Sequence, residues 1–180
     1  MKDKIIWAID VLQEKFAIPK KIDPNKLLTK NRHDIKIRIE FLKDILENEK
    51  SIEQTMYFQF VSDDKRRAHP PLEAKEMCKN FLTLFKDVKM NGISKPLNVA
   101  KLNSLTVKTG YFFDGKQVWV DFPNDTGYQL MNGAHRLAIA TYLKFENIPA
   151  KIFTPIAFPF PNYTDYIILR EEEYMKKMEN

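Results

Sequence analysis

The chain has 180 residues, with 29 lysines and arginines against 24 aspartates and glutamates, a net charge of +5 and one cysteine. A single cysteine excludes an intramolecular disulfide and a Cys-x-x-Cys metal site, and no apolar run is long enough for a membrane helix. Acidic residues interrupt the first apolar stretch, so we expect no signal peptide and a reduced, cytoplasmic protein. The positive charge suits an anionic partner such as a nucleotide, a phosphorylated metabolite or nucleic acid, although a genome rich in lysine would give the same charge.

The first third of the chain predicts two helices and a strand. Residues 2–16 and 34–49 both carry apolar side chains at helical spacing, with Pro19 and the sequence "IDPN" between them. Asp34 is the predicted N-cap of the second helix. The buried stripe expected on the first helix consists of Ile5, Ile6, Ile9, Leu12 and Phe16. Residues 55–62, "TMYFQFVS", are rich in aromatic and β-favouring types and predict a strand.

The remainder predicts a mixture of helices and short strands. A helix is expected over 71–90, closed by Asn91-Gly92, and a hairpin around Asp114-Gly115. The segments "KPLNVAKL", "YQLM" and "IPAKIF" predict strands, whereas 134–143 and 165–178 predict helices. Elements of these lengths in this order predict a compact α+β (mixed α/β) domain with a short mixed sheet and flanking helices.

The segment "MNGAHRL" holds the strongest candidate binding site. Gly133 allows a sharp turn, after which the amides of Ala134, His135 and Arg136 are the unpaired donors of a helix N-terminus. Such donors favour an anion, Arg136 can clamp phosphate oxygens, and His135 can donate a hydrogen bond or shuttle a proton. Asn132 can cap the helix or contact the ligand. The alternative is an ordinary turn with His135 and Arg136 facing solvent.

The sequences "NGISKPLNV" and "YQLMNGAHRLAIATYLKFENIPAKIF" resemble the ParB/sulfiredoxin-like superfamily. The positions in register with that pattern are Gly92, Pro96, Val99, Gly133, His135, Arg136, Ala138, Ala140, Ile148 and Pro149. The resemblance implies a nucleotide-binding core over 55–155, with an N-terminal helical extension (1–54) and a C-terminal extension with a final helix (156–180). It also implies that the Gly-x-His-Arg segment binds the phosphates of ATP or a related nucleotide.

Two departures narrow the activity that the resemblance implies. Ala134 stands where sulfiredoxin has its catalytic cysteine, so sulfinic acid reduction lacks its nucleophile. Only 27 residues follow "IPAKIF", too few for the DNA-binding domain of partition proteins. The branches that remain are free-serine or sugar-alcohol kinases and the ParB-like proteins of surface-polysaccharide gene clusters. "RHDIKIRIEFL" is similar to the latter, with His33 in place of the usual aromatic residue.

Phosphoryl transfer to a small hydroxyl-bearing metabolite requires carboxylates for Mg²⁺ or for a general base. The kinases resembled here carry an acidic residue before the long helix, where this chain has Asp63, Asp64 and Glu73. Arg66 and His69 of the same loop could reach the phosphates. The alternative is a solvated, charged turn. No residue is assigned to a protein-only metal site.

Three further residues are candidates of lower specificity. Arg32 and Asp34 could contact a substrate beside the cleft, or simply form an N-cap with a local ion pair. Lys95 could face the nucleotide or solvent. The sequence thus predicts a nucleotide-dependent small-molecule kinase, with a non-catalytic nucleotide-responsive regulator as the alternative. Nucleic-acid binding has only the net charge and the family resemblance in its favour.

Overall fold

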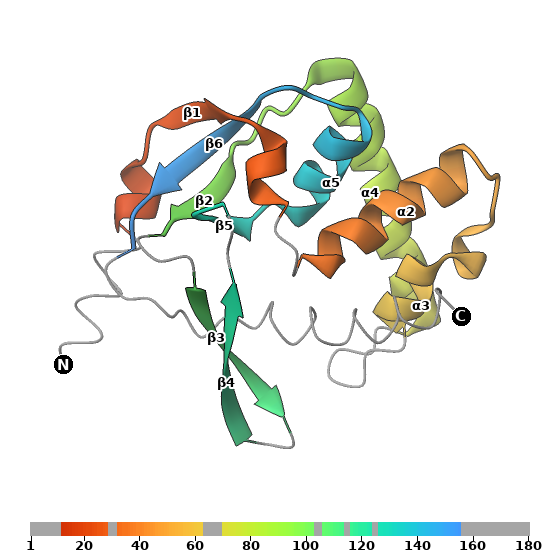
Figure 1. Cartoon of the computed structure of the whole chain (residues 1–180). Coiled ribbons are helices and arrows are strands. Elements are labelled where there is room, and N and C mark those ends of the chain that lie inside the picture. Colours follow the sequence, from red (N-terminus) through yellow and green to blue (C-terminus); the bar gives the residue numbers. More distant parts are fainter. Residues whose placement is uncertain are drawn as a thin grey trace.

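The computed structural model describes residues 12–28, 32–62, 70–102, 106–113, 116–123 and 126–155. Residues 106–113 and 116–123 are described by their backbone alone. Helices and a four-stranded mixed sheet confirm the predicted α+β class. Figure 1 shows the sheet at one side of the described part, with the helices gathered beside it.

The main sheet has the strand order β1-β6-β2-β5. Strand β2 (Leu97–Lys101) runs parallel to β6 (Ile148–Phe153) and antiparallel to β5 (Tyr128–Asn132). These three strands confirm the predictions for "KPLNVAKL", "YQLM" and "IPAKIF". The fourth strand, β1 (Pro19–Ile22), pairs antiparallel with β6 and was predicted only as a break between helices. Alternating burial places one face of the sheet against the helices.

The described helices are α2 (His33–Leu46), α3 (Met56–Ser62), α4 (Pro71–Asn91) and α5 (Ala134–Tyr142), with short 3-10 turns η1 (Pro24–Leu27) and η2 (Ile52–Gln54). Helices α4 and α5 confirm the predictions for 71–90 and 134–143. They run side by side in the same direction, because the ring of Phe81 contacts that of His135 at a tilt and the ring of Phe85 contacts that of Tyr142 edge to face (Figure 1). The first residues of α4 therefore lie at the same end of the helix pair as the start of α5.

The predicted strand over 55–62 is wrong, because these residues form helix α3. The buried side chains are Met56, Tyr57, Phe60 and Val61, a spacing that covers one face of a helix. Thr55 starts the helix, since its hydroxyl accepts a hydrogen bond from the amide of Phe58 at 3.3 Å. Helical packing against α2 and α4 thus overrides the β preference of the aromatic residues.

Two predictions for the first third of the chain are also corrected. Helix α2 begins at His33 with Arg32 at the N-cap, so Asp34 lies inside the first turn and is not the cap. Residues 12–16 are helical as predicted, but Leu12 and Phe16 remain 51% and 73% exposed. The expected stripe is therefore not buried at its described end.

The predicted hairpin is confirmed as strands β3 (Thr106–Phe113) and β4 (Lys116–Pro123), which pair antiparallel with Gly110 opposite Trp119. It leaves the main sheet between β2 and β5 and points away from it (Figure 1). The predicted turn residues 114–115 and the predicted helix over 165–178 lie outside the described residues.

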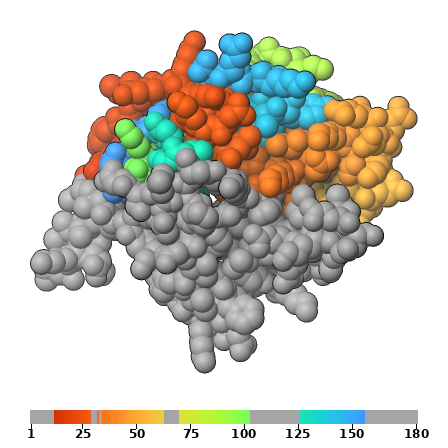
Figure 2. Space-filling view, in the orientation of Figure 1, coloured from red at the N-terminus to blue at the C-terminus, as the bar shows by residue number. Residues whose placement is uncertain are grey.

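The described residues of the N-terminal extension that the sequence predicts belong to the same body as the core. Strand β1 extends the main sheet, η1 contacts both α5 and β5, and α2 packs along α5. Figure 2 shows this from outside, with atoms of residues 126–155 lying between those of the N-terminal segment and those of α2. The hydrophobic core accordingly draws on α2, α3, α4, α5 and the sheet together.

Candidate functional site

The candidate site is built around the turn that joins β5 to α5. Gly133 is buried and has φ +110° and ψ 25°, a left-handed conformation that residues with a side chain rarely adopt. A β-carbon at this position would lie 2.8 Å from Cγ of Leu97 and 3.2 Å from Nη2 of Arg136. Glycine is therefore required both by the backbone angle and by the close approach to β2.

Three amides follow the turn at the start of α5. The first amide that closes a helical turn is that of Leu137, which donates to the carbonyl of Gly133 at 2.9 Å. Within the ranges that the structure describes, no acceptor takes the amides of Ala134, His135 or Arg136. The nine-residue helix adds its dipole to these donors. Asn132 is exposed at the end of β5, and the N-cap of α5 is Gly133 and not Asn132.

Arg136 folds back across the turn. Its Nη1 donates to the carbonyls of Lys95 and Pro96, the latter at 2.8 Å, so α5 is tied to the entry of β2. Partial burial lowers the pKa of the guanidinium, which remains far above neutrality. Both bonds use Nη1, so among the described residues the donors on Nη2 and Nε are left for a ligand. Lys95, whose carbonyl accepts one of these bonds, is an exposed residue.

The side chain of His135 contacts helices α3 and α4. Its Nε2 lies 2.7 Å from the hydroxyl of Tyr57 on α3, and its ring centroid lies 4.6 Å from that of Phe81 on α4. Burial, and to a smaller extent the charge of Arg38, together lower the pKa of His135 to about 3. The imidazole is therefore neutral at pH 7, which does not fit the predicted role as a proton shuttle.

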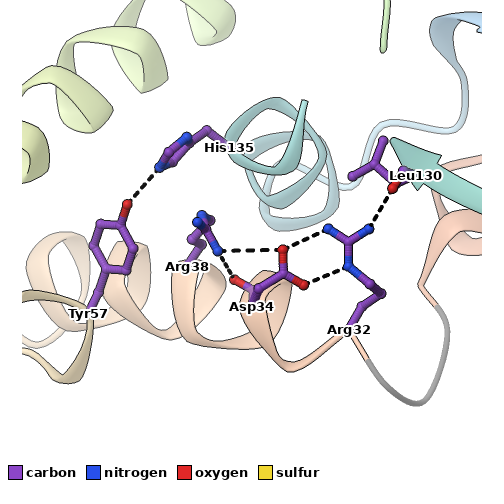
Figure 3. A network of polar contacts seen from close by, with 6 residues as sticks. All are labelled: Arg32, Asp34, Arg38, Tyr57, Leu130 and His135. Atoms are coloured by element: carbon purple, nitrogen blue, oxygen red, sulfur yellow. Dashed lines mark hydrogen bonds and ion pairs between the residues drawn. The ribbon is translucent and has the colours of Figure 1, made fainter. Parts of the chain in front are cut away.

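Arg32 and Asp34 form a buried pair at the start of α2 (Figure 3). Nε and Nη2 of Arg32 each donate to one carboxylate oxygen of Asp34 at 2.6 Å, and the two side chains are 3% and 2% exposed. Nη1 of Arg32 donates to the carbonyl of Leu130 on β5 at 3.0 Å. The local ion pair considered in the sequence is present, but it is buried and joins α2 to the sheet, so neither side chain reaches solvent as a substrate contact would.

A second arginine completes this group. Arg38 of α2 donates through Nη1 to the main-chain carbonyl of Asp34 at 2.5 Å and lies 3.6 Å from its carboxylate. Its guanidinium also lies over the ring of Tyr57, 5.3 Å from the centroid. Burial would raise the pKa of Asp34, but the charges of Arg32 and Arg38 outweigh it and leave this pKa below 3.8.

Four predicted site residues, Asp63, Asp64, Arg66 and His69, lie outside the described residues. Glu73 is exposed in the first turn of α4. It lies eight residues before Phe81, about 12 Å along the helix axis. Because α4 and α5 run in the same direction, Glu73 and residue 70 lie toward the end where α5 begins.

Sequence reasoning missed Tyr57 and Arg38 as parts of the site. Tyr57 was assigned to a strand, although Thr55 before an i, i+4 apolar pair is a helix start signal. The spacing of Arg38 could have predicted its contact with Asp34, since the two residues lie four positions apart on one helix. The contact between Tyr57 and His135 spans 78 residues of sequence, so no local pattern could have predicted it.

Comparison with known proteins supplies no relative: no family model, no curated protein and no solved structure matches the chain. None of the described helices has both the length and the apolar character of a membrane span. In the same part of the chain, no three His, Cys, Asp or Glu side chains cluster closely enough to hold a metal ion. The buried thiol of Cys78 has its pKa raised to about 12 by burial, so it is not a nucleophile at neutral pH.

The low pKa of His135 predicts a distinctive titration. Of the three histidines in the chain, His135 should keep the NMR signals of a neutral ring from pH 8 to pH 5. The imidazole takes up a proton near pH 6.5 in the unfolded chain but only near pH 3 in the folded protein. The stability that His135 contributes is therefore lost as pH falls from about 6.5 toward 3. Proton-detected titration of the ring signals, assigned with His135→Asn, measures it. A midpoint above pH 6 for His135 would contradict the buried contact with Tyr57.

Proposed function

We propose that the protein binds the polyphosphate of a nucleotide such as ATP at the turn from β5 into α5. The observation that carries the proposal is the conformation of Gly133, which brings to one place the guanidinium of Arg136 and three amides that no described residue accepts from. Amides at a helix N-terminus and a planar guanidinium are the donors that phosphate oxygens accept from most readily. The resemblance to the ParB/sulfiredoxin-like superfamily supports the same ligand.

Arg136 suits this role because one nitrogen of its guanidinium is already hydrogen-bonded to the main chain. Its bonds to the carbonyls of Lys95 and Pro96 hold the guanidinium over the turn, so little side-chain freedom is lost when a ligand binds. Lys95, whose main-chain carbonyl accepts one of these bonds, is exposed, and its ammonium would add a second positive charge. The net charge of +5 favours the approach of an anion over longer range.

The further step, transfer of a phosphoryl group to a small hydroxyl-bearing metabolite, depends on carboxylates. Asp34 does not serve, because it is buried and neutralised by Arg32 and Arg38. The carboxylates proposed for a nucleotide-bound Mg²⁺ are those of Asp63, Asp64 and Glu73, of which Glu73 lies in the first turn of α4, at the end toward the start of α5. Mg²⁺ would neutralise charge on the transferred group. Binding of the nucleotide without transfer of its phosphoryl group would instead indicate a regulator, and the neutral ring of His135 favours this alternative.

Arg136→Ala tests the proposal at its main charged contact. We expect the Kd for ATP with Mg²⁺ to rise about tenfold or more, because a charge-assisted bond to phosphate is lost. Isothermal calorimetry with ATP, ADP and CTP measures the affinity, and circular dichroism checks the fold. Lys86→Ala is the matched control, since it removes a positive charge from an exposed position on α4 and should change Kd less than about twofold. Equal affinities of the wild type and Arg136→Ala would refute the assignment.

A further inference from the structure

The ring of Tyr57 is held in one place by its surroundings. Its centroid lies 5.3 Å from that of Phe41 and 5.8 Å from that of Phe81, and the guanidinium of Arg38 lies over one face at 5.3 Å. The side chain is 1% exposed. Its hydroxyl therefore meets Nε2 of His135 at 2.7 Å from a fixed direction (Figure 3).

The chemistry of the two groups decides which one donates. A phenol is a stronger acid than the N–H of a neutral imidazole, and the bare imidazole nitrogen is a better acceptor than a phenol oxygen. The bond therefore runs from the hydroxyl of Tyr57 to Nε2, which places the single proton of the neutral ring on Nδ1. Nδ1 lies on the side of the ring nearer to the backbone of α5, and none of the described residues bonds it.

We propose that Tyr57 is a positioning residue that holds His135 in the Nδ1–H tautomer, so that Nδ1–H joins the amides of α5 as a neutral donor to a phosphate oxygen. The inference rests on the proposed function for its ligand. It assigns the phenol on α3 a role in recognition, through His135, of a ligand bound at the start of α5. A neutral donor of this kind contributes equally at pH 6 and pH 8.

The tautomer of the free protein is the first test, and it does not depend on any ligand. Long-range ¹H–¹⁵N spectra distinguish a protonated Nδ1 from a protonated Nε2 in a neutral ring. We expect the signature of a protonated Nδ1 in the wild type and a mixed or reversed signature in Tyr57→Phe. A protonated Nε2 in the wild type would overturn the inference, whatever the protein binds.

The second test is the affinity for ATP with Mg²⁺. Tyr57→Phe should raise Kd about fivefold to tenfold, whereas Tyr142→Phe, which removes a phenol hydroxyl at the far end of α5, should leave it unchanged. If Tyr57→Phe does not fold, two variants of His135 replace it in this test. The amide nitrogen of His135→Asn can replace Nδ1, whereas that of His135→Gln replaces Nε2. His135→Asn should therefore bind ATP more tightly than His135→Gln. Equal binding by Tyr57→Phe and the wild type, or by the two His135 variants, would overturn the inference. Absence of ATP binding by the folded wild type would overturn the proposed function, while the tautomer would still report on Tyr57.

Discussion

Gly133→Ala is expected to destabilise the protein by about 2–5 kcal/mol and to abolish measurable binding of ATP at the turn. Alanine at φ +110° costs about 1–2 kcal/mol, and the overlap of its β-carbon with Cγ of Leu97 at 2.8 Å adds about 1–3 kcal/mol. To relieve the overlap, β2 and α5 must separate, which moves the amides and Arg136 away from one another. Urea unfolding followed by circular dichroism measures the stability, and calorimetry measures the binding.

Gly127→Ala is the control that isolates the cost of placing alanine at a positive φ. Gly127 has φ +72°, but no atom of the described residues lies within 4 Å of the position of its added β-carbon. It should therefore cost only about 1–2 kcal/mol and leave ATP affinity intact. If Gly133→Ala were as stable as Gly127→Ala and bound ATP normally, the close approach of the turn to β2 would be wrong.

Asp34→Asn is expected to have the second large effect, a loss of about 3–5 kcal/mol at pH 7. The change removes the only negative charge that the described residues place between the guanidinium groups of Arg32 and Arg38. A buried charge without its partner is costly because neither water nor a counter-charge solvates it. Loss of the paired geometry would also free Arg32 from Leu130 and loosen β5 just before the turn. Chemical denaturation at pH 7 measures the effect.

The pH dependence of the wild type gives an independent measure of Asp34. Its folded pKa lies below the value of 3.8 expected for the unfolded chain, because the attraction of two arginines exceeds the cost of burial. The stability that it contributes is therefore fully present above about pH 4 and is lost as pH falls through the folded pKa. This loss of stability below pH 4 should be smaller in Asp34→Asn.

Asp44→Asn on the same helix is the control for Asp34→Asn. The ion pair of Asp44 with Lys50 is partly exposed and should contribute at most about 1 kcal/mol to stability. A cost for Asp34→Asn as small as that of Asp44→Asn would contradict the buried network.

Several elements follow from local sequence patterns. The apolar spacing of 71–90, the Pro at its start and the Gly at its end predict α4 to within one residue. The turn residues Asn132-Gly133 and the apolar run after them predict the start of α5. Each of these signals acts within a few residues, so the sequence alone is enough to detect it.

The network in Figure 3 depends on contacts that no local pattern contains. Arg32 reaches the carbonyl of Leu130 across 98 residues, and Tyr57 reaches His135 across 78. The aromatic content of 55–62 favours a strand, and only the packing of α3 against α2 and α4 makes it helical. Packing against α3 and α4 also makes His135 a neutral, partly buried ring and not the predicted proton shuttle, since desolvation is the largest cause of its lowered pKa.

The most direct test of the central claim is a ¹H–¹⁵N titration of the folded protein with ATP and Mg²⁺, in which backbone amide signals are followed. We predict saturable shifts that are largest for Gly133, Ala134, His135 and Arg136, accompanied by the side-chain Nε signal of Arg136. Saturable shifts confined to other parts of the chain, or no shifts at millimolar ATP, would show that the turn into α5 does not hold a polyphosphate.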